Sequence, residues 1–453
     1  MKKGKIKSRE GKIFRAFVVL FASLVIMSPL ALSADPATTE GEGGGFFSGI
    51  SRGVSNFFSG LPSIFSELSP ADVGHKPRIK PHFSATQGFS SNARLGPKQA
   101  DAAWQARIAP GITFSIPSGK LYTEFDYTYG FSTTQGRHTS ANISTHNLSA
   151  LARYDLSADT VFGLGNNIQL SEVPGEPGEP FILETATAQV KHRLGPKLSA
   201  SLSDTVQVFS DKSKVRRNTF VDNGVNVQLP YDVTNDLSLG PTFAWNVRNF
   251  QKLNDKDYWQ IQPGISAGYR LGPKTNLHGN FGWAYRKFSN GSNDSESELV
   301  YGAGLSHKLG RKFIWSLDYA KTLVDTFDTG FVFRDTPEAT TLDNLNRDFR
   351  VVKSHRLSTS ATYRLNEKNS FNAFADFQFI DANPKDDIVS RRDGDEKAME
   401  IGGGYTYRLN RYVTFDVTYA FGRRFTADAS VPAARIRNEY TYHKLSGGVN
   451  IAI

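Results

Sequence analysis

Cysteine is absent from the 453 residues of this chain. Its absence excludes disulfide bonds, thiolate metal ligands and an N-terminal cysteine that carries lipid. The nine histidines are scattered, and none stands in a serine and aspartate arrangement typical of a catalytic triad. Metal-binding motifs and glycine-rich phosphate loops are also missing. We therefore predict a protein that is not an enzyme, with no catalytic residues, no metal and no cofactor.

Long apolar runs are scarce, and the one that exists lies near the N-terminus. Residues 16–32 read "AFVVLFASLVIMSPLAL", after a basic stretch that ends at Arg15 and before the small residue Ser33. This is the three-part pattern of a secretory signal peptide, so residues 1–33 are predicted to be removed on export. Pro29 and the short length of the run argue against a membrane anchor. No second run of about 18 apolar residues follows, which excludes a spanning helix in the rest of the chain.

The excess of positive charge is smaller than it first looks. The formal net charge is +9, which on its own would suggest an acidic partner such as nucleic acid. Residues 1–33 carry seven Lys and Arg against Glu10, so most of the excess belongs to the signal segment. We therefore predict no nucleic-acid partner.

In the remaining sequence, apolar and polar residues alternate in many segments. In "YWQIQPGISAGYRL", residues 258–271, Trp259, Ile261 and Ile265 fall on one face, whereas Gln260 and Gln262 fall on the other. Successive side chains of a strand point to opposite faces, so the pattern predicts a β-strand with one apolar and one polar face. Residues 277–286, 313–319 and 413–421 alternate in the same way.

A nine-residue motif recurs along the chain. "YRLGPKTNL" begins at residue 269, and related segments begin at residues 154, 192, 231, 307, 363 and 407. The first five starts in chain order are 38 or 39 residues apart, the length of two strands, a tight turn and a looser connection. Gly and Pro in "RLGPK" are typical of the turn. Short turns are expected near residues 117–120, 155–159, 195–197, 232–236, 272–274, 309–312, 365–369 and 409–411. Longer connections are expected near 91–101, 132–142, 171–181, 211–217, 250–256, 289–297, 326–348, 382–396 and 426–435.

These patterns predict an all-β fold, a transmembrane up-and-down antiparallel β-barrel of about 18 strands in a Gram-negative outer membrane. The barrel would span residues 78–453, with short periplasmic turns and longer extracellular loops. Aromatic residues next to the turns, such as Tyr269, Tyr363 and Phe415, would form an interfacial girdle. The final "SGGVNIAI" resembles the C-terminal signal that the barrel assembly machinery reads. Outer-membrane lipid and that machinery are therefore expected partners.

A barrel of this size encloses an aqueous lumen unless something fills it. The second residue of each repeat would face the lumen just above the periplasmic turn, and it is basic in most copies. We predict that the periplasmic mouth is lined by Arg193, Arg270, Lys308, Arg364 and Arg408. Further lumen-lining candidates are Arg107, Arg248, Arg286, Arg356, Arg424 and Tyr258. Such a ring of charge favours anions, although the same residues are equally consistent with solvated strand ends or with pairing to lumen carboxylates.

Two segments are candidates for narrowing or closing the lumen. The longest connection carries Asp328, Asp335, Glu338 and Asp343, and it either folds inward as a constriction loop or stays external. Residues 34–77 form a Gly-rich periplasmic linker with a short amphipathic segment, in which Phe46–Phe47 recur as Phe57–Phe58. This segment either plugs the lumen, lies on the inner leaflet, or stays disordered until bound.

The barrel region resembles the β-barrel porins associated with exopolysaccharide production. The likeness rests on the hairpins "GYRLGPKTNL", "TYRLNEKNSF" and "TYRLNRYVTF", the first strand "RIKPHFSATQGFSSN" and the close "YHKLSGGVNIAI". It implies an outer-membrane channel for polymer export, with a polysaccharide and a periplasmic synthesis or export component as partners. A general or anion-preferring diffusion porin is the alternative, and a structural or adhesive barrel with a blocked lumen is the second alternative.

Overall fold

The computed structural model describes ten segments of the chain: residues 77–91, 102–136, 140–173, 176–211, 219–251, 257–289, 295–325, 351–382, 396–426 and 440–453. All regular elements in these segments are β-strands. Across the same ten segments, there is no helix of the length and apolar character needed to cross a membrane.

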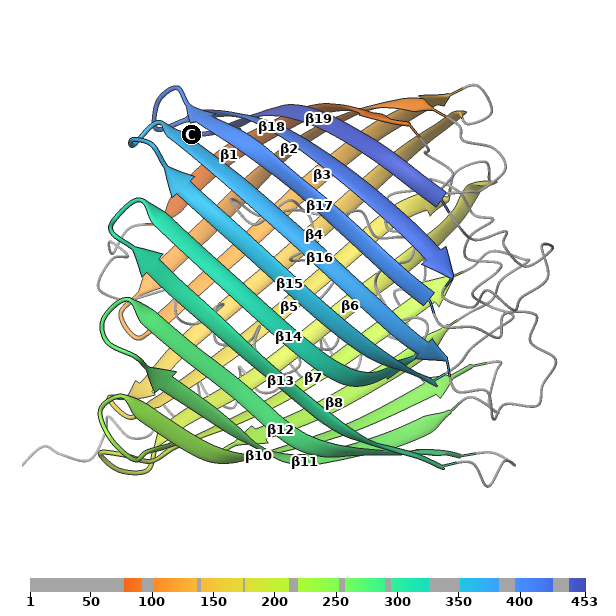
Figure 1. The fold of residues 1–453 in the computed structure, drawn as a ribbon. Coiled ribbons are helices and arrows are strands. Elements are labelled where there is room, and N and C mark those ends of the chain that lie inside the picture. The colour runs from red at the N-terminus through yellow and green to blue at the C-terminus, as the bar shows by residue number, and fades with distance from the viewer. Residues whose placement is uncertain are drawn as a thin grey trace, which may run out of the picture.

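The strands follow one another with only turns and connections between them (Figure 1). Their bounds are β1 (Arg78–Ser90), β2 (Ala103–Ser118), β3 (Leu121–Gly136), β4 (Ser140–Ser157), β5 (Thr160–Val173), β6 (Glu176–Arg193), β7 (Ser199–Asp211), β8 (Phe220–Gln228), β9 (Tyr231–Asp232), β10 (Leu237–Phe250), β11 (Tyr258–Arg270), β12 (Thr275–Phe288), β13 (Ser295–Leu309), β14 (Phe313–Asp325), β15 (Val351–Arg364), β16 (Asn369–Ala382), β17 (Glu396–Arg408), β18 (Val413–Thr426) and β19 (Tyr440–Ala452).

The sheet closes on itself. Strands that are neighbours in the chain pair antiparallel, except β8 and β9, which both pair with β10. Because β1 pairs with both β2 and β19, the sheet has no open edge. The first and last strands meet in the register His82↔Ala452 to Ser90↔Lys444. Closure is what a lipid environment requires, because an open edge would leave unpaired N–H and C=O groups in hydrocarbon.

The short strands β8 and β9 together make one interrupted strand. Both pair with β10, and only Leu229 and Pro230 separate them. Proline cannot donate to a ladder, which explains the break. At the same point β10 carries Gly240, where an added Cβ would lie 2.3 Å from the Leu229 carbonyl oxygen, so only glycine fits there. Counted this way, the barrel has 18 strands, as the sequence predicts.

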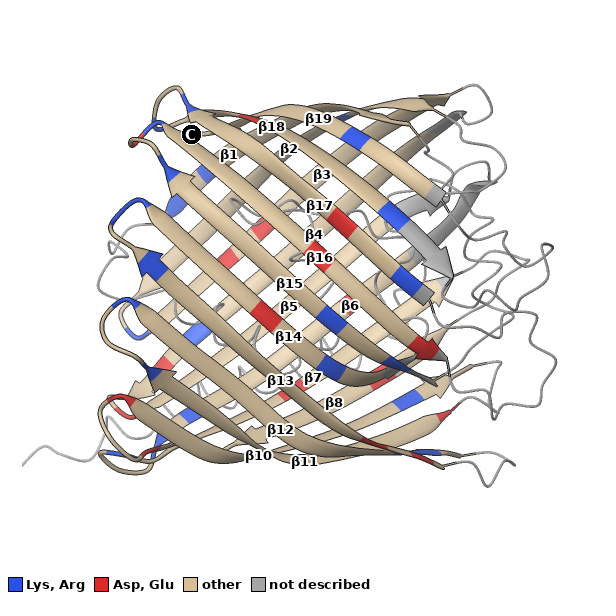
Figure 2. Cartoon of the chain, viewed as in Figure 1, with Lys and Arg blue, Asp and Glu red and all other residues tan. Residues whose placement is uncertain are grey.

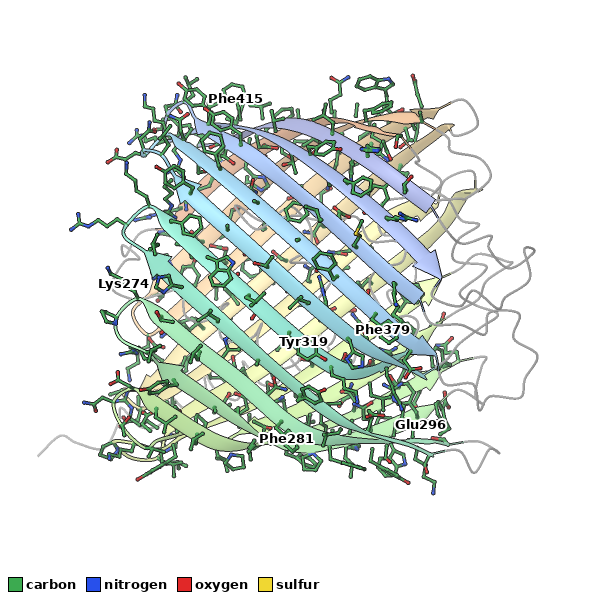
Figure 3. All side chains as sticks on the ribbon, in the orientation of Figure 1. Lys274, Phe281, Glu296, Tyr319, Phe379 and Phe415 are labelled. Atoms are coloured by element: carbon green, nitrogen blue, oxygen red, sulfur yellow. The ribbon has the colours of Figure 1, made fainter. Side chains whose placement is uncertain are left out.

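The outer wall of the barrel is apolar. Ile265, Phe281 and Val417 lie in the middle of their strands and are half exposed or more (59%, 51% and 50%). Figure 3 shows Phe281 pointing away from the barrel. Their polar neighbours along the chain, such as Asn280, therefore face inward, and the predicted alternation is confirmed. An apolar band on an outer wall is the surface that lipid tails cover.

Short connections gather at one end of the barrel, here called the turn end. They join β2 to β3, β4 to β5, β6 to β7, β9 to β10, β11 to β12, β13 to β14, β15 to β16 and β17 to β18. The start of β1 and the C-terminus lie at this end as well (Figure 1). All eight coincide with the short turns expected from the sequence. The opposite end is called the loop end.

Two kinds of turn residue close the hairpins at the turn end. Gly272 has φ +74° and Gly310 has φ +68°, in the left-handed region that favours glycine. Where the repeat has Asn in place of Gly, the side chain accepts backbone hydrogen bonds instead. Asn366 Oδ1 accepts from the N–H groups of Lys368 and Asn369, both at 2.9 Å. The repeated motif thus specifies a turn by either of two local mechanisms.

Three predicted connections at the loop end are shorter than expected. One of them, 289–297, ends earlier because β13 begins at Ser295. The other two are the predicted connections 132–142 and 171–181, where β3 continues to Gly136, β4 begins at Ser140, β5 continues to Val173 and β6 begins at Glu176. Ser and Thr dominate the first of these stretches. Outside the apolar band both faces of a strand meet water, so the alternation that marks a strand disappears while the pairing continues.

Candidate functional site

One backbone hydrogen bond recurs around the turn end. It fixes how far from this end of the barrel the second residue of each nine-residue motif lies. Its amide donates to the carbonyl of the last residue of the preceding turn, as in Arg193 N to Asp159 O (2.8 Å) and Arg270 N to Asp236 O (2.7 Å). The same bond is made by Asp155, Asp232, Lys308, Arg364 and Arg408. Equivalent bonds in equivalent hairpins place these seven residues at the same level of the barrel.

The side chains at this level face the lumen. Tyr269 and Leu271 are exposed on the outer wall, so alternation directs Arg270 between them inward. The same argument applies to the other four basic residues, whose neighbours Leu194, Leu309, Tyr363, Leu365 and Leu409 are exposed on the outer wall. Arg193, Arg270, Lys308, Arg364 and Arg408 are themselves exposed.

The charges of these five side chains are not neutralised by ion pairs. Among the residues that the structure describes, none of the five lies within 4.0 Å of a carboxylate oxygen. By contrast Asp155, an acidic member of the same level, is bonded to Arg153 Nε at 3.0 Å. No ion pair with a described carboxylate therefore offsets the charge of these five residues at the turn end.

The basic residues form an arc rather than a complete ring. Four of them, Arg270, Lys308, Arg364 and Arg408, lie on successive hairpins from β11 to β17, whereas Asp232 on β9 separates Arg193 from the rest. The turns add cations that the sequence analysis did not single out. These are the exposed residues Lys120, Lys197, Lys274, Lys312 and Lys368, whose carbonyls accept the recurring hydrogen bond. Figure 2 shows Lys and Arg on the turns at the left of the view, with Asp and Glu among them.

Deeper in the lumen, Arg356 belongs to a chain of paired groups on β15 to β19. Arg356 Nε donates to both carboxylate oxygens of Asp376, at 2.8 and 3.1 Å. Asp376 stands directly opposite Glu400 in the β16–β17 ladder, and both are 2% exposed. Tyr442 donates its hydroxyl to Glu400. This part of the wall is acidic and internally bonded, so Arg356 is not a free cation for a solute.

A second cluster lies on β8 to β12 near the loop end. Arg248 is paired with Asp222 through Nε (3.0 Å) and Nη2 (2.5 Å). The ring of Tyr258 lies between two guanidinium groups, with Arg286 Cζ 4.0 Å from its centroid and Arg248 Cζ 5.7 Å. All three side chains are nearly buried, at 2–3% exposure. The structure thus brings together three residues that alternation had assigned separately to the lumen.

The structure describes only some of the other candidate residues. Arg107 lies on β2 beside Gly130 of β3, on the inner wall. Arg424 lies in β18, but its side chain falls outside the described part of the chain, and so do Asp328, Asp335, Glu338 and Asp343 of the candidate constriction loop. The segment 34–76, with its candidate plug, lies outside as well.

The sequence analysis missed two groups of side chains. Phe220 and Phe250 pack with Arg248 on the inner wall, with the guanidinium 4.6 Å from the Phe220 ring. They stand at strand ends next to connections, where alternation gives a weak signal. On the outer wall, tyrosine hydroxyls bond histidine Nδ1 atoms across strands, as in Tyr127–His146, Tyr319–His355 and Tyr419–His443 (2.9, 2.8 and 2.7 Å). No sequence spacing links these pairs, because the ladder register creates them.

A closed antiparallel barrel with an apolar outer wall and a polar inner wall defines the class of transmembrane β-barrels. Residues 181–364 match the family described as "Outer membrane protein beta-barrel domain". The protein is accordingly a β-barrel of the Gram-negative outer membrane. A comparison with curated proteins found no match.

Several solved structures are similar to the chain. Pseudomonas aeruginosa OccK5 (OpdH) is 12% identical, with 83% of this chain and 98% of that one covered and a TM-score of 0.45. Pseudomonas aeruginosa OpdK, solved with vanillate, is 11% identical over 83% of this chain and 99% of that one, with a TM-score of 0.48. The FrpB iron transporter from Neisseria meningitidis is 13% identical over 79% of this chain and 64% of that one, with a TM-score of 0.45.

Proposed function

We propose that the barrel is an outer-membrane channel that prefers anions and exports an extracellular polysaccharide. The observation that supports this proposal best is the arc of basic side chains at the turn end. Arg193, Arg270, Lys308, Arg364 and Arg408 share one level and form no ion pair with the described carboxylates. Charges at one level add their potentials, and the low-dielectric wall around them focuses the field into the lumen.

The polymer is proposed from the resemblance of the repeated hairpins to barrels associated with exopolysaccharide production. Aromatic side chains on the inner wall are consistent with contact to sugar rings. Phe374 and Tyr442 lie there among charged groups, each beside a glycine of a neighbouring strand, Gly402 and Gly422. The export direction and a periplasmic synthesis or export partner belong to the same proposal.

The test measures ion selectivity of the purified protein in a planar bilayer. With a salt gradient near 0.1 M, the reversal potential should have the sign of an anion-preferring channel. Converting all five arc residues to Glu should reverse that sign. Raising the salt to 1 M should weaken the preference, because the Debye length falls from about 10 Å to about 3 Å.

The matched control carries the same number of charge reversals in predicted connections. Converting Lys212, Lys214, Arg216, Arg391 and Arg392 to Glu should change the reversal potential much less. In cells, the five-residue arc variant should reduce export of an acidic polymer, whereas the control variant should not. A wild-type channel that is open but prefers cations at low salt would contradict the proposal.

A diffusion porin is the alternative that the same arc supports, because a basic mouth attracts small anions as well as a charged polymer. The two functions differ in what deletion of the gene does. Loss of surface polysaccharide with unchanged uptake of small anions supports export. Slower uptake of small anions with unchanged polysaccharide supports the porin.

A further inference from the structure

Arg286 on the inner wall near the loop end is buried without a complete set of partners. The side chain is 3% exposed. Its Nε donates to Gln260 Oε1 at 2.9 Å, but Nη1 is enclosed and has no hydrogen-bond partner. Guanidinium groups carry five N–H donors and remain charged in proteins, so an enclosed donor without an acceptor is unusual.

No carboxylate of the described residues lies within ion-pair distance of this guanidinium. Asp222 is bonded to Arg248 through two nitrogen atoms. Glu296 stands opposite Arg286 in the β12–β13 ladder and has contacts of its own, but no ion pair with Arg286 is found among the described residues. The lysine that follows in the chain, Lys287, is exposed on the outer wall and so takes no part in the cluster. Arg286 is thus a buried cation that forms no direct ion pair with the described carboxylates and has one guanidinium nitrogen without a hydrogen-bond partner.

Burying a charge costs free energy unless an opposite charge or a full set of hydrogen bonds compensates it. An anion that meets Nη1 would supply both, and a charge-assisted bond to a guanidinium is among the stronger polar contacts in proteins. Two contacts already hold the guanidinium of Arg286 in place. Gln260 fixes Nε and the Tyr258 ring supports its face at 4.0 Å, so little side-chain entropy remains to be lost on binding.

The surroundings of Arg286 are aromatic. Tyr258 packs edge-on against Phe288, with ring centroids 6.1 Å apart and planes at 73°. Phe288 is only partly buried and lies on the same inner face as Arg286, two residues away along β12. A site with one fixed charge beside aromatic surface suits a ligand that carries a carboxylate on a ring with an apolar face.

We propose that Arg286, with Gln260 and Tyr258, forms a binding site for the carboxylate of an acidic sugar, whose ring packs against Phe288. The inference deepens the proposed channel function and rests on it for the route by which the sugar arrives. Binding itself does not depend on conduction. Because Nη1 is enclosed, the carboxylate reaches it only when the side chains around it move. In exchange the guanidinium gains the hydrogen-bond acceptor that it lacks.

The test is calorimetric titration of the purified, folded barrel in detergent with sodium glucuronate, with glucose and sodium sulfate as comparison ligands. Glucuronate should bind, glucose should bind at least tenfold more weakly, and sulfate should not match glucuronate. Arg286→Gln should weaken glucuronate binding about tenfold to a hundredfold, the range expected for loss of a charge-assisted hydrogen bond. Lys287→Gln makes the same charge change one residue away on the outer wall and should leave binding unchanged.

Arg286→Lys keeps the charge but loses the planar stack, so it should fall between wild type and Arg286→Gln. This variant also keeps the test decisive if Arg286→Gln does not fold, as judged by heat-modifiable mobility on gels. Equal binding of glucose and glucuronate, equal binding of sulfate, or unchanged binding in the folded variants would overturn the inference. Anion selectivity in bilayers, measured on the same preparations, reports separately on the proposed function.

Discussion

Replacing Phe281 by arginine should destabilise the barrel by about 2–4 kcal/mol, the cost of this side chain at the middle of the bilayer on the lipid face of a barrel. Phe281 is the seventh of the 14 residues of β12 and is 51% exposed on the outer wall. With a rise of about 3.4 Å per residue and a tilt near 40°, the strand extends roughly 34 Å along the membrane normal. Phe281 therefore lies close to the midplane, where arginine is least tolerated. The ratio of folded to unfolded protein should fall by about thirtyfold to several hundredfold.

The assay is reversible urea unfolding of the barrel in lipid vesicles, followed by tryptophan fluorescence. Asn280→Arg is the control, because Asn280 is the preceding residue and faces the lumen, where it lies beside Gly302 of β13. That variant should change stability by no more than about 0.5 kcal/mol, as for other solvated positions. Equal destabilisation by both changes would show that the assignment of the two walls is wrong.

Three further outcomes are expected. A cysteine at Pro273 should resist an impermeant maleimide too large for the pore in intact cells and react once the outer membrane is permeabilised, because its turn is predicted to be periplasmic; labelling in intact cells would invert the orientation. Gly272→Ala should cost about 1–2 kcal/mol of folding free energy, since φ there is +74°, whereas Gly195→Ala, at the same repeat position but without a positive φ, should be nearly neutral. Arg356→Gln should cost about 3–5 kcal/mol by leaving Asp376 buried and unpaired, and the double change with Asp376→Asn should recover most of that loss; no recovery would mean that the pair is not the cause.

The fold was predictable because a barrel wall imposes a period of two on the sequence wherever lipid touches it. In residues 258–271 apolar and polar residues alternate throughout, and the strand β11 (Tyr258–Arg270) contains all of them except Leu271. The repeat spacing of 38 or 39 residues then gave the hairpins and the turn end. Beyond the apolar band no lipid contacts the strands, so apolar and polar residues no longer alternate. The ends of β3 and β4 at the loop end are therefore predicted as a connection.

The candidate site was predictable only one residue at a time. Alternation assigned Arg248, Tyr258 and Arg286 to the inner wall, but it carries no information on which side chains meet. That depends on the register of the ladders between β8, β10, β11 and β12. The stack of Tyr258 between two guanidinium groups therefore had no signal in the linear sequence. The basic residues at the turn end could be placed at one level from the sequence alone, because each occupies the same position of the repeated motif.

The recurring bond at the turn end has a consequence for how such a wall can change over evolutionary time. Each hairpin joins the next through the same amide and carbonyl, as in Lys308 N to Lys274 O and Arg364 N to Lys312 O. Because these joints are interchangeable, a whole hairpin can be duplicated or deleted, and its neighbours will rejoin with the same bond. Both chain ends then stay on the same side of the membrane, which gain or loss of a single strand would not allow. The circumference is therefore adjustable in units of two strands, and each unit gained brings its own charge to the mouth.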